Sequence, residues 1–192
     1  AISPDGKYGV AWFDLAASGG VLSDKQTFQE VTVVHLEPGQ ESAVNLSVGF
    51  RPSEVRFPPD SKVAWVVTDQ GVSTISLAAP PKPAIVPTVP LVKDPVGEAP
   101  PSNVRFTPDG KWALCRVAGY AGFRAVALPG GAITDVPLDG EPTGLEIAPD
   151  GKQALFVLRD LKEVAFARIP EDLAGPAAIA TASTEPYMAG QA

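Results

Sequence analysis

The amino-acid sequence predicts an all-β protein in which short antiparallel strands form about four four-stranded sheets. Two observations support this prediction: a turn motif that occurs four times, and prolines and glycines that separate short apolar runs. The chain has 192 residues, including 21 prolines and 18 glycines, and 45% of its residues are hydrophobic. Such a composition allows a sizeable core and is typical of short strands joined by tight turns.

The repeated motif is a Pro-Asp-Gly-Lys turn. It occurs as SPDGK at 3–7, PPDSK at 58–62, TPDGK at 107–111 and APDGK at 148–152. The aspartates of successive copies are 55, 49 and 41 residues apart. A mean interval of about 48 residues matches a four-stranded propeller blade better than the shorter solenoid repeats.

The repeats therefore predict one β-propeller domain or segment. Its four blades are expected at approximately 1–50, 51–97, 98–139 and 140–192. These blades form either part of a larger ring or a closed four-bladed ring.

Each turn is expected to join two strands of a hairpin. Proline presets φ near −65°, aspartate hydrogen-bonds the backbone that follows it, and glycine adopts the left-handed conformation. Ser61 replaces the turn glycine in the second copy. If Ser61 is left-handed, Ser61→Gly should stabilise the fold by several tenths of a kcal/mol to about 1 kcal/mol.

Alternating apolar residues predict the strands in the same order within each repeat. Inner strands precede the turn and are expected at 54–57, 103–106 and 144–147. Second strands follow the turn, at 8–13, 63–68, 112–117 and 153–158. Third strands are expected at 30–36, 71–77, 123–128 and 163–169, and fourth strands at 42–48, 84–90, 132–138 and 176–182.

The second and third residues after each turn lysine differ in size. The second position is small in every copy: Gly9, Ala64, Ala113 and Ala154. The third is large and apolar: Val10, Trp65, Leu114 and Leu155. Because a small residue leaves room for a large one opposite, we expect neighbouring blades to bury both faces of each sheet.

Two of these segments resemble known bacterial repeats. The stretch GEPTGLEIAPDGKQALFVL (140–158) is similar to the YVTN-type propeller repeat, and VRFTPDGKWALCRV (104–117) is similar to the WD40-like repeat of the TolB type. The chain departs from the YVTN pattern at Ser61 and in its third strands. The resemblance implies an extracytoplasmic binding or scaffolding module, whereas a minority of such proteins are lactonases or other enzymes.

Few side chains offer catalytic chemistry. The chain has one histidine, His35, and one cysteine, Cys115. A Ser-His-Asp triad at His35 stays open by residue count, but the sequence contains no nucleophile elbow, metal-spaced histidine pair or phosphate loop. Cys115 occupies an interior repeat position and is expected to be an inert thiol. We therefore predict no catalytic residue, no metal site and no cofactor.

Three charged residues occupy equivalent positions on successive inner strands: Arg56, Arg105 and Glu146. Inner strands border the central channel of a propeller, where charges must be paired or solvated. These residues therefore predict either a set of channel-side ion pairs or a polar funnel for an anionic or carbonyl-bearing ligand.

The loops between second and third strands are further binding candidates, because functional residues concentrate on loops held by a rigid scaffold. Tyr120 lies in the glycine-containing loop GYAG (119–122). Arg159 and Asp160 lie in the mixed-charge tip RDLK (159–162).

Charge and hydropathy exclude two classes of partner. The net charge is −7 and no basic cluster is present, which argues against nucleic-acid binding. No apolar run is long enough for a membrane helix, which argues against membrane insertion.

We therefore predict a non-enzymatic binding scaffold, periplasmic or secreted, for a protein or small-molecule ligand. A lactonase-like propeller enzyme and a sensor domain of a larger secreted or anchored protein are the alternatives.

The ends of the chain raise a separate expectation. The sequence begins three residues before its first PDGK, and its only methionine is Met188, so we expect a processed or trimmed segment. The first blade then has almost no inner strand, which leaves an exposed sheet edge. Either the tail 185–192 closes a four-bladed ring, or further sequence or a second copy completes a larger one. We expect the larger ring, and with it self-association through apolar blade faces.

Overall fold

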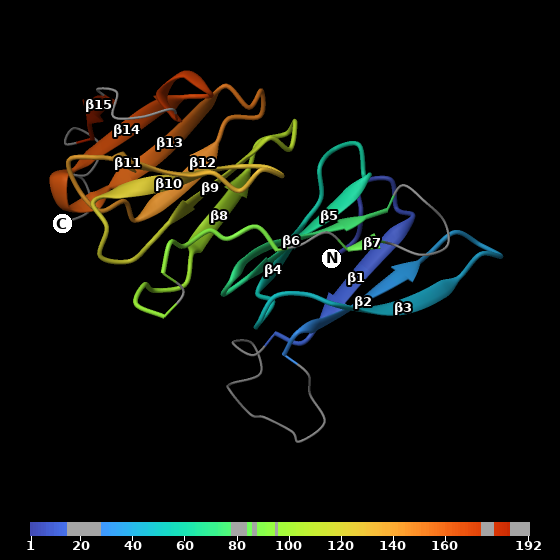
Figure 1. Cartoon of the computed structure of the whole chain (residues 1–192). Coiled ribbons are helices and arrows are strands. Elements are labelled where there is room, and N and C mark those ends of the chain that lie inside the picture. The colour runs from blue at the N-terminus through green and yellow to red at the C-terminus, as the bar shows by residue number, and fades with distance from the viewer. Residues whose placement is uncertain (15–27, 78–83, 86–87, 95, 174–178, 185–192) are drawn as a thin grey trace, which may run out of the picture. The chain divides into compact units, whose positions relative to one another are not determined.

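The computed structural model describes residues 1–14, 28–77, 84–85, 88–94, 96–173 and 179–184 (Figure 1). These residues form antiparallel strands and two short 3-10 helices, η1 (Arg159–Leu161) and η2 (Glu171–Leu173). Within them, neither helix has the length and apolar character that crossing a membrane requires. The predicted all-β class is confirmed.

The chain divides into two compact units, Ala1–Pro90 and Leu91–Ala192, and each contains two sheets. In the first unit, one sheet comprises β1 (Tyr8–Trp12), β2 (Glu30–His35) and β3 (Ser42–Ser47). The other comprises β4 (Glu54–Arg56), β5 (Val63–Thr68), β6 (Gly71–Ser76) and β7 (Ala84–Ile85).

The second unit contains two four-stranded sheets. One comprises β8 (Ser102–Phe106), β9 (Trp112–Arg116), β10 (Gly122–Ala127) and β11 (Ile133–Pro137). The other comprises β12 (Gly144–Ile147), β13 (Gln153–Leu158), β14 (Glu163–Arg168) and β15 (Ala180–Ser183). Strands adjacent in sequence are also adjacent in each sheet, as expected for propeller blades.

The three predicted inner strands are confirmed as β4, β8 and β12. Each pairs antiparallel with the strand that follows its turn. The first sheet has no named inner strand among the described residues, and an isolated bridge joins Ile2 to Gly9 at that edge. Parts of two predicted fourth strands, 86–87 and 176–178, lie outside the described residues, as does the tail 185–192. The single-domain organisation and the blade limits stay predictions.

All four repeat turns share one hydrogen-bond pattern. In each, the left-handed residue donates its N–H to the carbonyl three residues earlier, as between Gly110 and Thr107 at 2.9 Å. In each, the aspartate carboxylate also accepts the lysine N–H two residues later, as from Lys111 to Asp109 at 3.1 Å. The motif therefore fixes the turn through its own backbone and carboxylate.

Ser61 has the predicted left-handed backbone, with φ at 55°. Its hydroxyl also accepts a hydrogen bond from the Asp5 N–H at 3.2 Å. Ser61→Gly would thus relieve the strained backbone but remove this link between the first two turns. The stabilising effect of that substitution stays a prediction.

Each sheet has two faces that the repeat distinguishes. We call the face with the large third position after the turn lysine the forward face, and the opposite face the rear face. In the second unit, Leu114 and Phe123 on the forward face of β8–β11 pack against Leu145 and Phe156 on the rear face of β12–β15. The two phenylalanine rings stack with centroids 4.1 Å apart.

The first unit repeats this order of packing. Val10 and Val33, on the forward face of β1–β3, pack with Ala64 and Val66, on the rear face of β4–β7. Forward-on-rear stacking therefore builds the core of both units, and Figure 1 shows the paired sheets of each unit. One large residue departs from the expected burial: Leu155 is only half-buried.

Candidate functional site

Two of the predicted inner-strand charges meet in the second unit. The Arg105 guanidinium on β8 donates through Nε to Glu146 Oε2 at 3.0 Å and through Nη2 to Glu146 Oε1 at 2.7 Å. Glu146 lies on β12, the inner strand of the adjacent sheet. The two parallel hydrogen bonds make a bidentate ion pair across neighbouring blades.

This pair is accessible to solvent. The Arg105 side chain is 25% exposed and the Glu146 side chain 67%. Because both groups satisfy one another at a wet surface, the pair bridges the sheets without a large desolvation cost. A role for it in binding a ligand stays a prediction.

Arg56 has a different partner. It lies on β4 in the first unit, is exposed, and forms a salt bridge with Glu54 on the same strand. The structure thus brings Arg105 and Glu146 together and pairs Arg56 within its own strand.

A residue that the sequence reasoning missed shapes the Arg105 site. Asn103 has a left-handed backbone, with φ at 51°, and the pairing of β8 with β9 shifts register between Ser102 and Arg105. In the amide orientation that satisfies both of its polar atoms, the Asn103 side chain hydrogen-bonds the backbone of Leu145 twice. Its amide nitrogen donates to the Leu145 carbonyl and its amide oxygen accepts the Leu145 N–H, both at 3.2 Å. The side chain therefore hydrogen-bonds the edge of β12 beside Glu146. Asparagine tolerates a left-handed backbone better than most residues, and this is the sequence feature that could have indicated the role of Asn103.

The predicted loop residues belong to two loops of the second unit, and a third loop adjoins both. We call residues 118–122, 139–143 and 159–161 the loop surface. The Gly119 N–H donates to Glu141 Oε1 at 3.1 Å, which joins the first two loops. Gly140 contacts Leu161, since a Cβ atom at position 140 would lie 3.2 Å from Leu161 Cδ1.

The candidate side chains differ in exposure on this surface. Arg159 and Asp160 are exposed on η1. Tyr120 is half-buried, with its ring against Gly122, where a Cβ atom would lie 2.6 Å from Tyr120 Cε1. Burial raises the pKa of the Tyr120 hydroxyl, so this group stays a neutral hydrogen-bonding phenol near neutral pH.

His35 has partners on both ring nitrogens. Nε2 lies 2.9 Å from Glu37 Oε2, and Nδ1 lies 3.0 Å from the Gln40 carbonyl. The ring is 8% exposed and stacks on Tyr8 with centroids 4.9 Å apart. A triad requires a hydroxyl at one ring nitrogen, and these positions are taken by a carboxylate and a carbonyl.

Cys115 is fully buried on β9, as its repeat position predicts. Its Sγ lies 3.9 Å from the Leu91 carbonyl. Burial raises the pKa of the thiol to about 12, so the nucleophilic thiolate is not populated near neutral pH.

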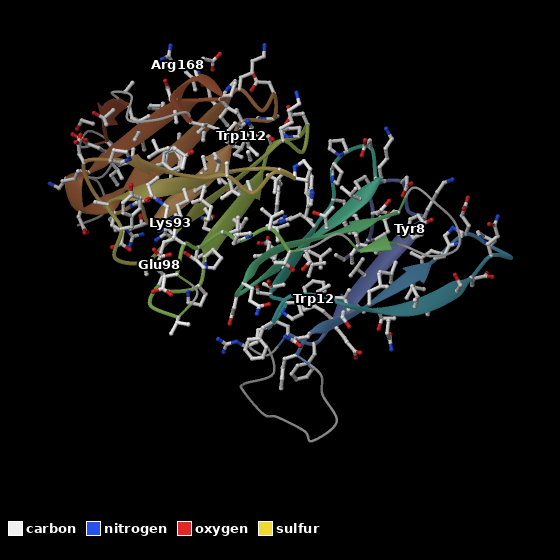
Figure 2. All side chains as sticks on the ribbon, in the orientation of Figure 1. Tyr8, Trp12, Lys93, Glu98, Trp112 and Arg168 are labelled. Atoms are coloured by element: carbon white, nitrogen blue, oxygen red, sulfur yellow. The ribbon has the colours of Figure 1, made fainter. Side chains whose placement is uncertain are left out.

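The strongest electrostatic site was not predicted. Arg124 on β10 is 4% exposed and donates to Glu98 Oε2 at 2.6 Å, to Glu98 Oε1 at 2.8 Å and to Asp135 Oδ1 at 2.9 Å. Lys93 Nζ donates to Asp135 Oδ2 at 2.6 Å. We call these four residues the Arg124 cluster. Figure 2 labels Lys93 and Glu98, which approach β10 from the segment preceding β8.

The cluster balances two positive and two negative charges. Hydrogen bonds from Arg124 lower the pKa of Glu98 to about 2. Asp135 also has a lowered pKa, because its hydrogen bonds with Lys93 and Arg124 outweigh the opposing effect of its burial. Each guanidinium nitrogen of Arg124 already donates to a carboxylate, so the cluster holds Lys93 and Glu98 against the sheet. Among the described residues, no group of three or more His, Cys, Asp or Glu side chains is arranged to hold a metal ion.

No protein-family model and no curated protein matches the chain. Solved structures do. A candidate 6-phosphogluconolactonase from Bacteroides uniformis is 20% identical, with a TM-score of 0.59 over 96% of this chain and 52% of that one. The β-propeller domain of Myceliophteria thermophila Cps50 (Swd1) is 12% identical, with a TM-score of 0.56 over 88% and 51%.

A third structure is the periplasmic gluconolactonase PpgL from Pseudomonas aeruginosa. It is 16% identical, with a TM-score of 0.53 over 88% of this chain and 52% of that one. The chain thus spans about half the length of the structures it resembles. Identities this low show the fold alone. The protein is an all-β chain of the β-propeller fold, with four antiparallel sheets in its described part.

Proposed function

We propose that the chain is a non-enzymatic binding module of the β-propeller class, which contacts a protein or small-molecule ligand through its loop surface. The observation that carries this proposal is the joining of the three loops. The Gly119–Glu141 hydrogen bond and the Gly140–Leu161 contact hold them together. Arg159 and Asp160 then offer a donor and an acceptor, and Leu161 offers an apolar side chain that is 43% exposed. Binding sites combine apolar and polar groups in this way.

The contacts of the reactive side chains support a binding role over catalysis. His35 is hydrogen-bonded through both ring nitrogens, and Cys115 is a buried thiol. Arg105 and Glu146 neutralise one another. Each of these groups would have to give up its present partner, or leave its buried site, before it could act on a substrate.

The proposal includes two finer points. We place the chain among the YVTN and TolB-type propeller repeats, because its four turns share one sequence motif and one hydrogen-bond pattern. We also propose an extracytoplasmic location. That location is supported by the resemblance to the periplasmic gluconolactonase PpgL.

A peptide library displayed on phage tests the binding site. Peptides enriched on the immobilised chain should lose affinity for the Tyr120→Ala and Arg159→Ala variants. Val96→Asp is the matched control, because Val96 is 97% exposed outside the loop surface. Enriched peptides that bind all of these variants equally would show that the loop surface is not the binding site.

A lactonase-like enzyme is the second candidate. Two resembling structures are described as a candidate 6-phosphogluconolactonase and a gluconolactonase, and Arg105 and Glu146 lie on inner strands where such a substrate could approach. Hydrolysis of 6-phosphogluconolactone and glucono-δ-lactone should be measured for the unaltered chain, His35→Ala and Glu146→Gln. We expect the spontaneous rate in every case. Turnover by the unaltered chain that falls in either variant would favour the lactonase-like enzyme over the binding module.

A further inference from the structure

The outer edge of the first sheet is an open row of backbone hydrogen-bonding groups. β3 pairs with β2 along its whole length, Ser42–Ser47, without a bulge. In the part of the chain that the structure describes, no strand pairs with the other edge of β3, and Figure 1 shows β3 at the outside of its sheet. A strand with a free edge is a template for pairing with a further strand.

Alternate residues of β3 direct their backbone groups to this free edge. Just beyond the strand, the Val48 N–H donates to the Gln29 carbonyl at 2.7 Å. Because hydrogen-bonded and non-hydrogen-bonded pairs alternate along an antiparallel ladder, Leu46 and Val44 also bond to β2. The N–H and C=O groups that point away from β2 belong to the residues between them: Ala43, Asn45 and Ser47.

The other outer strands have features that protect an edge from pairing. β7 has two residues and β15 has four. β11 has five, and they include the charged Asp135 and Pro137, which has no N–H. Short strands, charges and prolines are the usual ways to block edge pairing. β3 has six residues without a charge or a proline, so its edge is the least protected of the four.

We propose that β3 pairs antiparallel with β3 of a second copy of this chain, about a two-fold axis at Asn45. In this register Asn45 faces Asn45, and Ala43 of each copy faces Ser47 of the other. Each of these facing pairs exchanges two backbone hydrogen bonds. The contact is isologous, so it closes at a dimer and leaves no free β3 edge.

The side chains of β3 are complementary to themselves in this register. Val44 and Leu46 are half-buried on the forward face, at the margin of the core of the first unit. The two-fold axis sets Val44 of one copy opposite Leu46 of the other, and such apolar cross-strand pairs stabilise a sheet. Glu41, the charged residue nearest to β3, falls opposite Gly49 and meets no like charge. This self-complementarity favours a second copy as the occupant of the edge.

Static light scattering of the 192-residue chain over a range of concentrations tests the proposal. The unaltered chain should form dimers and nothing larger as its concentration rises. Asn45→Lys and Asn45→Asp should each weaken dimerisation by roughly 5-fold or more, because like charges then face one another at the two-fold axis. An equimolar mixture of the two variants should recover dimerisation, since lysine then faces aspartate. Recovery requires that position 45 faces itself, so it tests the register directly.

Thr181→Lys is the matched control, because it adds the same charge at an exposed position of another outer strand, β15, and should leave dimerisation unchanged. Thermal unfolding checks that each variant is folded. Asn45 is exposed and its side chain accepts a hydrogen bond from the Thr32 hydroxyl at an exposed site, so we expect both variants to pass. Asn45→Arg and Asn45→Glu repeat the test where either variant fails.

Hydrogen exchange of single amides gives a second readout. The amides of Ala43, Asn45 and Ser47 should exchange rapidly at low protein concentration and slowly in the dimer, whereas those of Val44 and Leu46 should be protected in both states. A chain that stays monomeric up to about 1 mM overturns the proposal. So does dimerisation that the Asn45 variants leave intact, or that their mixture does not recover. If a monomeric chain gains protection at Asn45 only with a peptide selected from a phage library, the edge binds a strand of another protein instead.

Discussion

Ser73 and Arg124 occupy the same position in the repeats of the two units, and they solve one packing problem in different ways. Ser73 pairs with Val66 across the sheet and Arg124 pairs with Cys115, and both partners stand four residues after the turn lysine. Both side chains are buried on a rear face. A buried polar group needs a hydrogen-bond partner, so each site must supply its own.

The neutral site needs few partners. The Ser73 hydroxyl accepts the Gly49 N–H at 3.0 Å and lies 2.7 Å from the Thr88 hydroxyl. At the charged site, a carboxylate takes the place of each of these two partners. Asp135 stands on the fourth strand where Thr88 stands in the first unit, and Glu98 comes from the segment that leads into the sheet.

Both sites therefore anchor the segment that precedes the inner strand of their own sheet. Gly49 lies before β4, and Glu98 lies before β8. Glu98 also accepts the Lys93 N–H at 2.9 Å, so Arg124 fixes a loop that is closed on itself. The comparison teaches that one device, a buried polar residue on the third strand, tolerates neutral or charged chemistry if every polar atom is paired.

Glu98→Gln should have the largest effect on stability. The variant leaves the buried Arg124 guanidinium with Asp135 as its remaining carboxylate. Because the Glu98 side chain is itself 27% exposed, we expect a loss of about 2 to 3 kcal/mol, at or below the lower end of the cost of breaking a fully buried pair. Urea unfolding followed by circular dichroism measures the loss. Glu146→Gln is the matched control, because the pair with Arg105 is exposed and should contribute at most about 1 kcal/mol. Equal losses would show that burial does not distinguish the two pairs.

Acid should weaken the charged site next. The pKa of Glu98 is lowered from 4.5 to about 2, so its ionised form stabilises the fold above pH 4.5, and this contribution is lost as the pH falls toward 2. The unfolding midpoints of the unaltered chain and of Glu98→Gln should therefore converge over this interval. A difference that stays constant down to pH 2 would contradict the assignment of the lowered pKa to Glu98.

The sequence predicted the features that depend on local chemistry. The four turns follow from proline, aspartate and a left-handed residue at fixed positions, and the strands follow from alternation. The Arg124 cluster could not be predicted in this way. Glu98 lies 26 residues before Arg124 in a segment without periodicity, so nothing local indicates that the two residues meet.

The candidate site was predicted only where it depends on repeat positions. Repeat positions placed Arg105 and Glu146 on equivalent inner strands, and the structure pairs them. The bulge at Asn103 depends on the edge of the adjacent strand, which a pattern of alternation does not reveal. Leu155 fits the repeat as well as Leu114 does, and its exposure depends on what covers the sheet.

Ser73→Ala should cost about 1 to 2 kcal/mol, less than Glu98→Gln. The variant leaves the Gly49 N–H and the Thr88 hydroxyl without their shared partner, but it leaves no buried charge. Ser76→Ala, on the same strand and half-buried, controls for the change in strand propensity. If Ser73→Ala costs no more than Ser76→Ala, the Ser73 hydroxyl does not anchor the loop before β4.

Thr32→Val should have the smallest effect. Thr32 takes the equivalent position in the first sheet, where its hydroxyl donates to Asn45 Oδ1 at 2.8 Å at an exposed site. Valine keeps the β-branched shape, and water can replace the lost hydrogen bond, so we expect a loss below about 0.5 kcal/mol at low protein concentration. Thr88→Val, at the partly buried site of the second sheet, should cost more. A loss from Thr32→Val as large as the loss from Thr88→Val would contradict the explanation by exposure.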